Sequence, residues 1–150
     1  MPDDSDLIAL YSGQILALAA DIPHAELIST PMAEVKKRAP LCGSNVTVSL
    51  DFDGKTITRF GQDVKACALG QTSASILGAH AIGATEAQIE KARNQLLALL
   101  KSDGPTPFTP FEKYEVLRPA RGFKNRHASI MLALEATLEA IQQAKKMAQP

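Results

Sequence analysis

The stretch VTVSLDFDG, residues 46–54, decides how this chain folds. Its apolar residues alternate strictly with polar ones up to Phe52, which is the pattern of a β-strand with one buried face. Asp53-Gly54 follows at once and predicts a tight hairpin. The return strand, residues 55–64, loses its alternation near Gly61, where we expect a bulge. The sequence therefore predicts an antiparallel pair of strands.

Upstream of the hairpin, residues 4–20 carry apolar side chains three or four positions apart. This spacing predicts an amphipathic helix, capped by Asp3, Asp4 or Ser5. Residues 22–40 contain three prolines and show no sustained period. We interpret this segment as an extended connection that has room for a short strand or a turn of helix.

Downstream of the hairpin the pattern is helical. A helix is expected to start at Cys67, with small side chains on its contact face, and to stop at Gly83. Thr85 and Gln88 form a capping box for a further helix, which residues 102–105 close. A proline-rich loop follows, and a last helix is expected over about residues 125–147.

Length and composition limit the class of protein. The 150 residues suit one domain, residues 1–150, and apolar residues make up 45% with no Trp, so aliphatic side chains must build the core. Sixteen basic residues balance sixteen acidic ones, which argues against nucleic acid or anionic lipid as the main partner. We find neither a secretory signal nor an apolar run long enough to span a membrane, and therefore expect a cytoplasmic protein with no membrane association.

Two cysteines, Cys42 and Cys67, are the main chemical signal. Cys42 stands between Leu41 and Gly43 just before a strand, and Cys67 is expected at a helix start, where the helix dipole favours a thiolate. In a reducing compartment a disulfide between them is not expected, so the thiols stay free, bind metal or react. The plainer alternative is that each is a small buried apolar residue.

Several motifs in series carry a resemblance to a known family. They are Tyr11, Ile15, Leu16 and Pro23, then PLCGS at 40–44, Cys67 before the small residues Ser73-Ala74-Ser75, GAT at 83–85, and RHAS at 126–129. In this order the chain resembles the iron-sulfur cluster assembly scaffolds of the NifU N-terminal (IscU-like) family. The resemblance implies an α+β fold, with a small antiparallel sheet packed against several helices and three cysteines gathered at one end.

The resemblance also implies a ligand set and shows where this chain departs from it. Cys42 matches the first family cysteine and Cys67 the second, but the third, expected directly after His127, is replaced by Ala128. An Asp expected two residues after the first cysteine is replaced by Ser44. The implied ligands are therefore Cys42, Cys67 and His127, holding iron or a 2Fe-2S cluster, and the implied role is a non-enzymatic scaffold, in a degenerate or accessory capacity.

The chemistry of such a site leaves alternatives open. A two-iron cluster or a tetrahedral zinc needs four donor positions, so water, a small thiol or a second chain must complete the set. The competing functions are a zinc-binding domain with the same residues and a thiol enzyme with Cys67 as nucleophile and His127 as base. His127 can equally just hydrogen-bond the backbone at its helix start.

Partners follow from the same resemblance, which implies a cysteine desulfurase or other iron-sulfur assembly proteins, and a homodimer if two chains share one site. The basic residues of 118–126 form either a docking patch or a solvated face. Within them, LRPAR at 117–121 distantly resembles the chaperone-recognition segment of the family.

Overall fold

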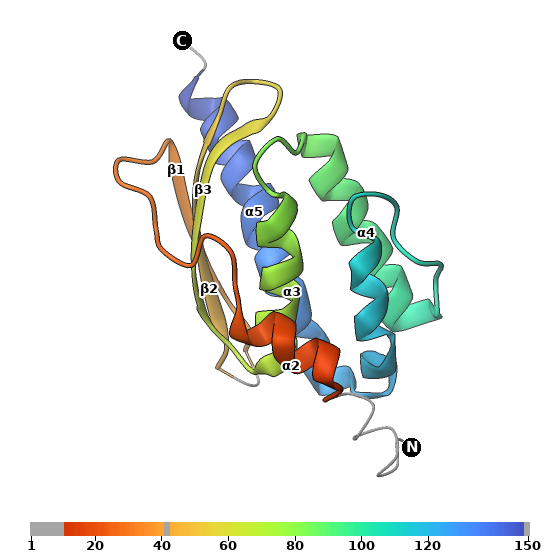
Figure 1. The fold of residues 1–150 in the computed structure, drawn as a ribbon. Coiled ribbons are helices and arrows are strands. Elements are labelled where there is room, and N and C mark those ends of the chain that lie inside the picture. Colours follow the sequence, from red (N-terminus) through yellow and green to blue (C-terminus); the bar gives the residue numbers. More distant parts are fainter. Residues whose placement is uncertain (1–10, 41–42, 149–150) are drawn as a thin grey trace.

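The structure is a computed structural model, and it describes residues 11–40 and 43–148. One layer is an antiparallel sheet in the order β1-β2-β3, and helices cover one of its faces (Figure 1). The strands are β1 (Ala33–Arg38), β2 (Asn45–Phe52) and β3 (Ile57–Lys65). The helices are α2 (Gly13–Ala20), α3 (Ala68–His80), α4 (Glu86–Ser102), the 3-10 helices η1 (Glu112–Gly122) and η2 (Lys124–Arg126), and α5 (His127–Met147). The predicted α+β fold is confirmed.

Helix α5 is the centre of the core. It packs against β1 and β2 on one side and against α3 and α4 on the other, and Figure 1 shows it running between the sheet and these helices. Its buried residues lie on most of its circumference, from Ile130 through Leu134 to Ala144. A helix that is apolar on most sides is stable only when other elements surround it. The sheet meets it with the alternating side chains of β2, whose Val46, Val48 and Leu50 are fully buried.

The hairpin forms as predicted, but its irregularity lies elsewhere. Both antiparallel pairings of β2 are regular except for a register shift between Asp51 and Phe52, so the bulge expected near Gly61 is wrong. Gly61 pairs normally with Ser49. Its lack of a side chain has another reason, because a Cβ there would overlap the backbone of Glu26 and Ile28 in the preceding connection.

The first described helix begins later than expected. Ser12 has extended backbone angles (φ −60°, ψ 162°), and its hydroxyl accepts a hydrogen bond from the backbone N–H of Ile15 at 3.4 Å. An extended residue of this kind caps a new helix, so a continuous helix over residues 4–20 is wrong at Ser12. The expected caps Asp3, Asp4 and Ser5 lie outside the described residues.

The connection 22–40 contains a full edge strand, β1. Only Ala33 and Val35 face the core, and charged side chains take the intervening positions. Two apolar residues are too few to give a period, which is why the sequence suggested no more than a short strand here.

The helices after the hairpin agree with the prediction. Cys67 is the N-cap of α3, and Thr85 and Gln88 make both bonds of the capping box, at 3.1 and 2.9 Å. The 3-10 helix η1 was not predicted. Its Arg118 bonds Glu115 at 2.6 Å, so part of the basic stretch is paired rather than free. Within the described part of the chain, no helix combines the length and apolar character needed to cross a bilayer.

Candidate functional site around Cys67

Cys67 links the end of β3 to the start of α3. Its backbone is extended (φ −66°, ψ 171°), and its side chain is partly buried. The beginnings of β2, α3 and α5 all lie at the same end of the molecule (Figure 1). This end therefore collects residues that are far apart in the sequence around one thiol.

Two serine hydroxyls connect the thiol to α5 and to the start of β2. The sulfur of Cys67 lies 3.5 Å from Oγ of Ser129, and the Ser129 hydroxyl donates to Oγ of Ser44 at 3.0 Å. Ser44 and Ser129 are both almost fully buried. Because a hydroxyl has only one proton to donate, Ser129 can serve Ser44 or a Cys67 thiolate, but not both at once.

The surroundings of Cys67 favour its ionised form. Partial burial raises the pKa of the thiol, but several donors oppose it and outweigh it, so the pKa lies below the ordinary thiol value. The donors are the backbone N–H groups of Gly70 and Leu69, the Ser129 hydroxyl and the Arg126 side chain. Hydrogen bonds to the charged form of a group favour that form. Since the thiolate is the nucleophile and the metal ligand, Cys67 is prepared for either role.

A shallow pocket of about 470 Å³ opens over this sulfur. Its lining includes the cationic side chains of Lys65 and Arg126 and the turn residues Gly43 and Ser44. Gly43, with φ +74°, is the residue directly after Cys42. Cys42 itself lies outside the described residues, but Gly43 and Ser44, which follow it, share the pocket with Cys67.

His127 occupies a different environment. The residue is only 8% exposed, and Nε2 lies 3.0 Å from the carbonyl oxygen of Ala120. A carbonyl can only accept, so Nε2 carries the proton and, in the neutral ring, Nδ1 keeps the lone pair. His127 and Ala128 line a separate pocket of about 800 Å³. The structure thus places Cys67 and His127 at the same end of the molecule, in the walls of different pockets.

Ser44 and Ala128, the two positions where this chain departs from the family, also lie in different pockets. Ser44 lies in the Cys67 pocket, whereas Ala128 is exposed in the His127 pocket. Among residues 11–40 and 43–148, no three His, Cys, Asp or Glu side chains are grouped closely enough to hold a metal ion. The described residues therefore offer a single thiolate, that of Cys67, and do not form a metal site by themselves.

Sequence reasoning missed two residues that act directly on the thiol, Ser129 and Arg126. They are the first and last residues of the RHAS motif, but a Ser on a helix and an Arg in a basic run are common surface residues, so neither type signals this role by itself. Only the packing of α5 against α3 shows that Ser129 meets Cys67.

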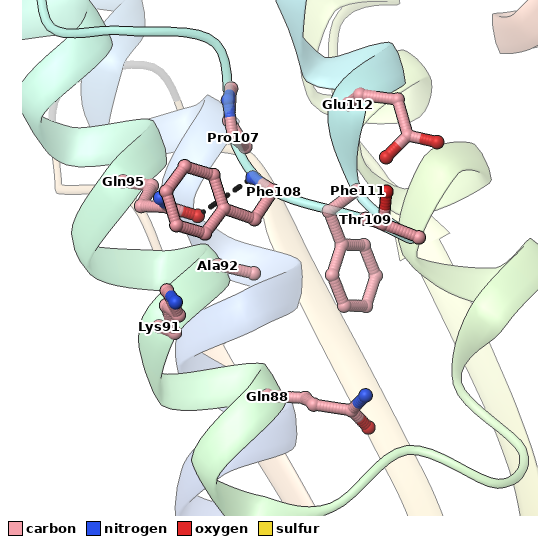
Figure 2. Close-up of a pocket in the computed structure, with 9 residues that line it drawn as sticks. All are labelled: Gln88, Lys91, Ala92, Gln95, Pro107, Phe108, Thr109, Phe111 and Glu112. Carbon is pink, nitrogen blue, oxygen red and sulfur yellow. Dashed lines mark hydrogen bonds between the residues drawn. The ribbon is translucent and has the colours of Figure 1, made fainter.

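A further pocket of about 600 Å³ lies between α4 and the loop that leads into η1 (Figure 2). There the backbone N–H of Phe108 donates to Oε1 of Gln95 at 2.9 Å, and Nζ of Lys91 lies 4.2 Å from the centroid of the Phe108 ring. The lining residues include neither Cys nor His. This pocket therefore holds no thiolate or imidazole that could take part in metal or sulfur chemistry.

Comparison with solved structures gives a consistent result. The chain is similar to a nitrogen-fixing NifU-like protein (N-terminal) from Brucella abortus, with 35% identity over 94% of this chain and 98% of that chain, and a TM-score of 0.91. It shares its fold with a putative iron-sulfur cluster assembly scaffold protein for the SUF system from Fervidobacterium islandicum, at 19% identity, 88% and 96% coverage, and a TM-score of 0.72. No protein-family model and no curated protein matches the chain.

Proposed function

Because the chain belongs to the family of NifU-like N-terminal proteins, we propose that it serves as a scaffold in iron-sulfur cluster assembly. Cys42 and Cys67 would be its thiolate ligands, and iron or a 2Fe-2S cluster its cargo. The observation that carries the proposal is the state of Cys67, a partly exposed thiol with a lowered pKa beside the turn that follows Cys42.

The donors around Cys67 suit a sulfur bound to iron as well as a free thiolate. Hydrogen bonds to a cluster's sulfur ligands are among the features that tune such clusters. Here Gly70 and Ser129 would provide them. Two thiolates leave the donor set incomplete, so water, a small thiol or a second copy of the chain would supply the rest. An incomplete set holds its cargo loosely, which suits a protein that passes the cargo on.

We assign His127 a conditional part in this site. Its Nε2 proton is engaged by Ala120, so ligation by that atom requires the ring to leave the carbonyl. Ligation by Nδ1 requires the metal to approach from the His127 side of α5. A thiol enzyme with His127 as base for Cys67 has less support, because the two side chains line separate pockets.

The role is proposed to be non-enzymatic, in the cytoplasm, with a cysteine desulfurase or another iron-sulfur assembly protein as partner. The zinc alternative uses the same thiolates and differs only in the metal. Metal analysis of the purified protein separates the two.

The direct test is anaerobic loading with ferrous iron and sulfide, followed by desalting and measurement of iron, sulfide and visible absorption per chain. We expect retained iron with sulfide in the parent protein and a large loss in Cys42→Ser and in Cys67→Ser, with Ser102→Ala as the matched control on an exposed serine. Retention that is equal in all four proteins contradicts the proposal, and retention of zinc alone favours the zinc-binding function.

A gain-of-ligand series sharpens the test. Ser44→Asp combined with Ala128→Cys restores the residues that the family resemblance implies and should raise the retained metal. Since the hydroxyl of Ser129 lies 3.5 Å from the sulfur of Cys67, Ser129→Cys is the comparison that asks which helix position reaches the site. No gain from either cysteine, in proteins that fold normally, would show that this end of α5 contributes no ligand.

A further inference from the structure

The pocket beside His127 has the size and lining of a small-molecule site. It holds about 800 Å³ and lies between the C-terminal half of α4, the 3-10 helices, and the first turns of α5. Its apolar lining includes Leu97, Leu100 and Met131, with Leu100 and Met131 almost fully buried. Ligand pockets of soluble proteins usually hold 300 to 1,000 Å³, roughly, and are mostly apolar with a few placed polar groups.

The charged groups of this pocket are mostly cationic. Lys101, Arg121 and Lys124 line it, against one carboxylate, Glu135. Glu135 is paired with Arg93 at 3.7 Å, and Arg121 with Asp103 at 2.9 Å. Within the described part of the chain, neither lysine forms an ion pair. The pocket therefore offers two uncompensated positive charges above an apolar floor.

The wall formed by α5 adds no free hydrogen-bond donor to this charge. Helix η2 runs directly into α5, so the backbone N–H of His127 is already bonded to the carbonyl of Lys124. The proton on Nε2 of His127 is likewise engaged by the carbonyl of Ala120. The attraction of the pocket for an anion therefore comes from the two lysines.

We propose that this pocket binds a small organic carboxylate with an apolar tail. The carboxylate would lie between Lys101 and Lys124, and the tail would cover Leu97, Leu100 and Met131. This inference does not depend on cluster assembly. A ligand there would touch Ala128, on the same helical turn whose Ser129 contacts Cys67, so binding would occur one helix face away from the thiol site.

The test is titration of the ¹⁵N-labelled protein with octanoate, followed by NMR. We expect chemical-shift changes concentrated at Leu97, Lys101 and residues 121–131, with a Kd on the order of 1 mM for a ligand of this size. Three related compounds serve as controls. Octan-1-ol lacks the negative charge of octanoate, octylammonium carries a positive charge instead, and acetate lacks the apolar tail. Each should bind markedly more weakly than octanoate. Binding of octan-1-ol as tight as that of octanoate overturns the proposal, as does a shift pattern centred elsewhere or none at all up to about 10 mM.

Variants test the assignment of residues. Lys101→Gln with Lys124→Gln should weaken octanoate binding about two- to tenfold, and Ala128→Glu, a change at an exposed position, should remove it. Lys36→Gln with Lys55→Gln, at two exposed lysines that do not line the pocket, is the matched control and should bind like the parent. Equal weakening by both lysine pairs means that only overall charge matters, and the proposal fails.

Discussion

The two faces of the first turn of α5 have different surroundings, although both belong to the RHAS motif. Ser129 turns toward Cys67 and Ser44, while His127 turns toward Ala120 and a separate pocket. Successive helical residues are rotated by about 100°, so residues two apart point to nearly opposite sides. A motif that is contiguous in the sequence is thus divided between two environments. Family position alone does not tell which of its residues faces the thiol.

The largest effect on stability should come from a substitution that overfills the contact between α3 and α5. In Gly70→Ala the new Cβ would lie 2.6 Å from Oγ of Ser129 and 2.8 Å from Cβ of Ala66. We expect unfolding free energy to fall by about 1–3 kcal/mol, despite the better helix propensity of Ala, because overpacking pushes the two helices apart. Urea denaturation measures it. Gly13→Ala in α2, where a Cβ meets nothing within 4 Å, is the control and should be neutral or slightly stabilising. Equal stability of the two variants would contradict the tight contact at Cys67.

A smaller effect is expected on the other face. His127→Ala removes the bond to Ala120 and leaves a buried gap, which should lower the unfolding free energy by about 1–2 kcal/mol. Cys67 should react with iodoacetamide at an unchanged rate, because the ring does not share its pocket. His80→Ala, at an exposed histidine, should cost less than about 0.5 kcal/mol. A change in the Cys67 rate would show that the two faces are coupled.

The smallest change in the free energy of unfolding, about 1 kcal/mol, is expected for Ser129→Ala. This substitution should nevertheless change the pKa and the reactivity of Cys67. Loss of this donor raises the pKa of Cys67 toward the ordinary value, so less thiolate is present near neutral pH. In a Cys42→Ser background, iodoacetamide should react about two- to tenfold more slowly at pH 7. At a pH above the pKa of both proteins the two rates should converge. Identical pH profiles would remove Ser129 from the list of groups that act on Cys67.

Local patterns in the sequence predicted most of the framework. The alternation of β2, the capping box at Thr85 and the start of α3 at Cys67 were correct, because each depends on residues a few positions apart. The prediction of a bulge near Gly61 was wrong, because a side chain at this position would overlap the backbone of Glu26 and Ile28, which is distant in the sequence. Contacts of this kind leave no periodic signal.

The candidate site was less accessible to prediction. Cys67 could be identified from its type and its place at a helix start. Its lowered pKa, however, depends partly on Ser129 and Arg126, which reach it only after α5 packs against α3. The role of Cys42 as a ligand stays a prediction, since it lies outside the described residues. The orientation of His127 away from Cys67 could not be predicted, because it depends on a hydrogen bond to the carbonyl of Ala120. That carbonyl is positioned by η1, a helix that the sequence did not predict.

The segment around Glu26 and Ile28, which packs over Gly61, also affects how two copies of this protein can associate. Strands β1 and β3 are the two borders of the sheet, and a bare border invites a strand from another chain. At β3 the backbone N–H of Gln62 is already bonded to the carbonyl of His24, at 2.9 Å. At β1 the outward side chains Glu34, Lys36 and Arg38 place charge along the strand. Both borders of the sheet are thereby protected against the addition of a strand from another chain.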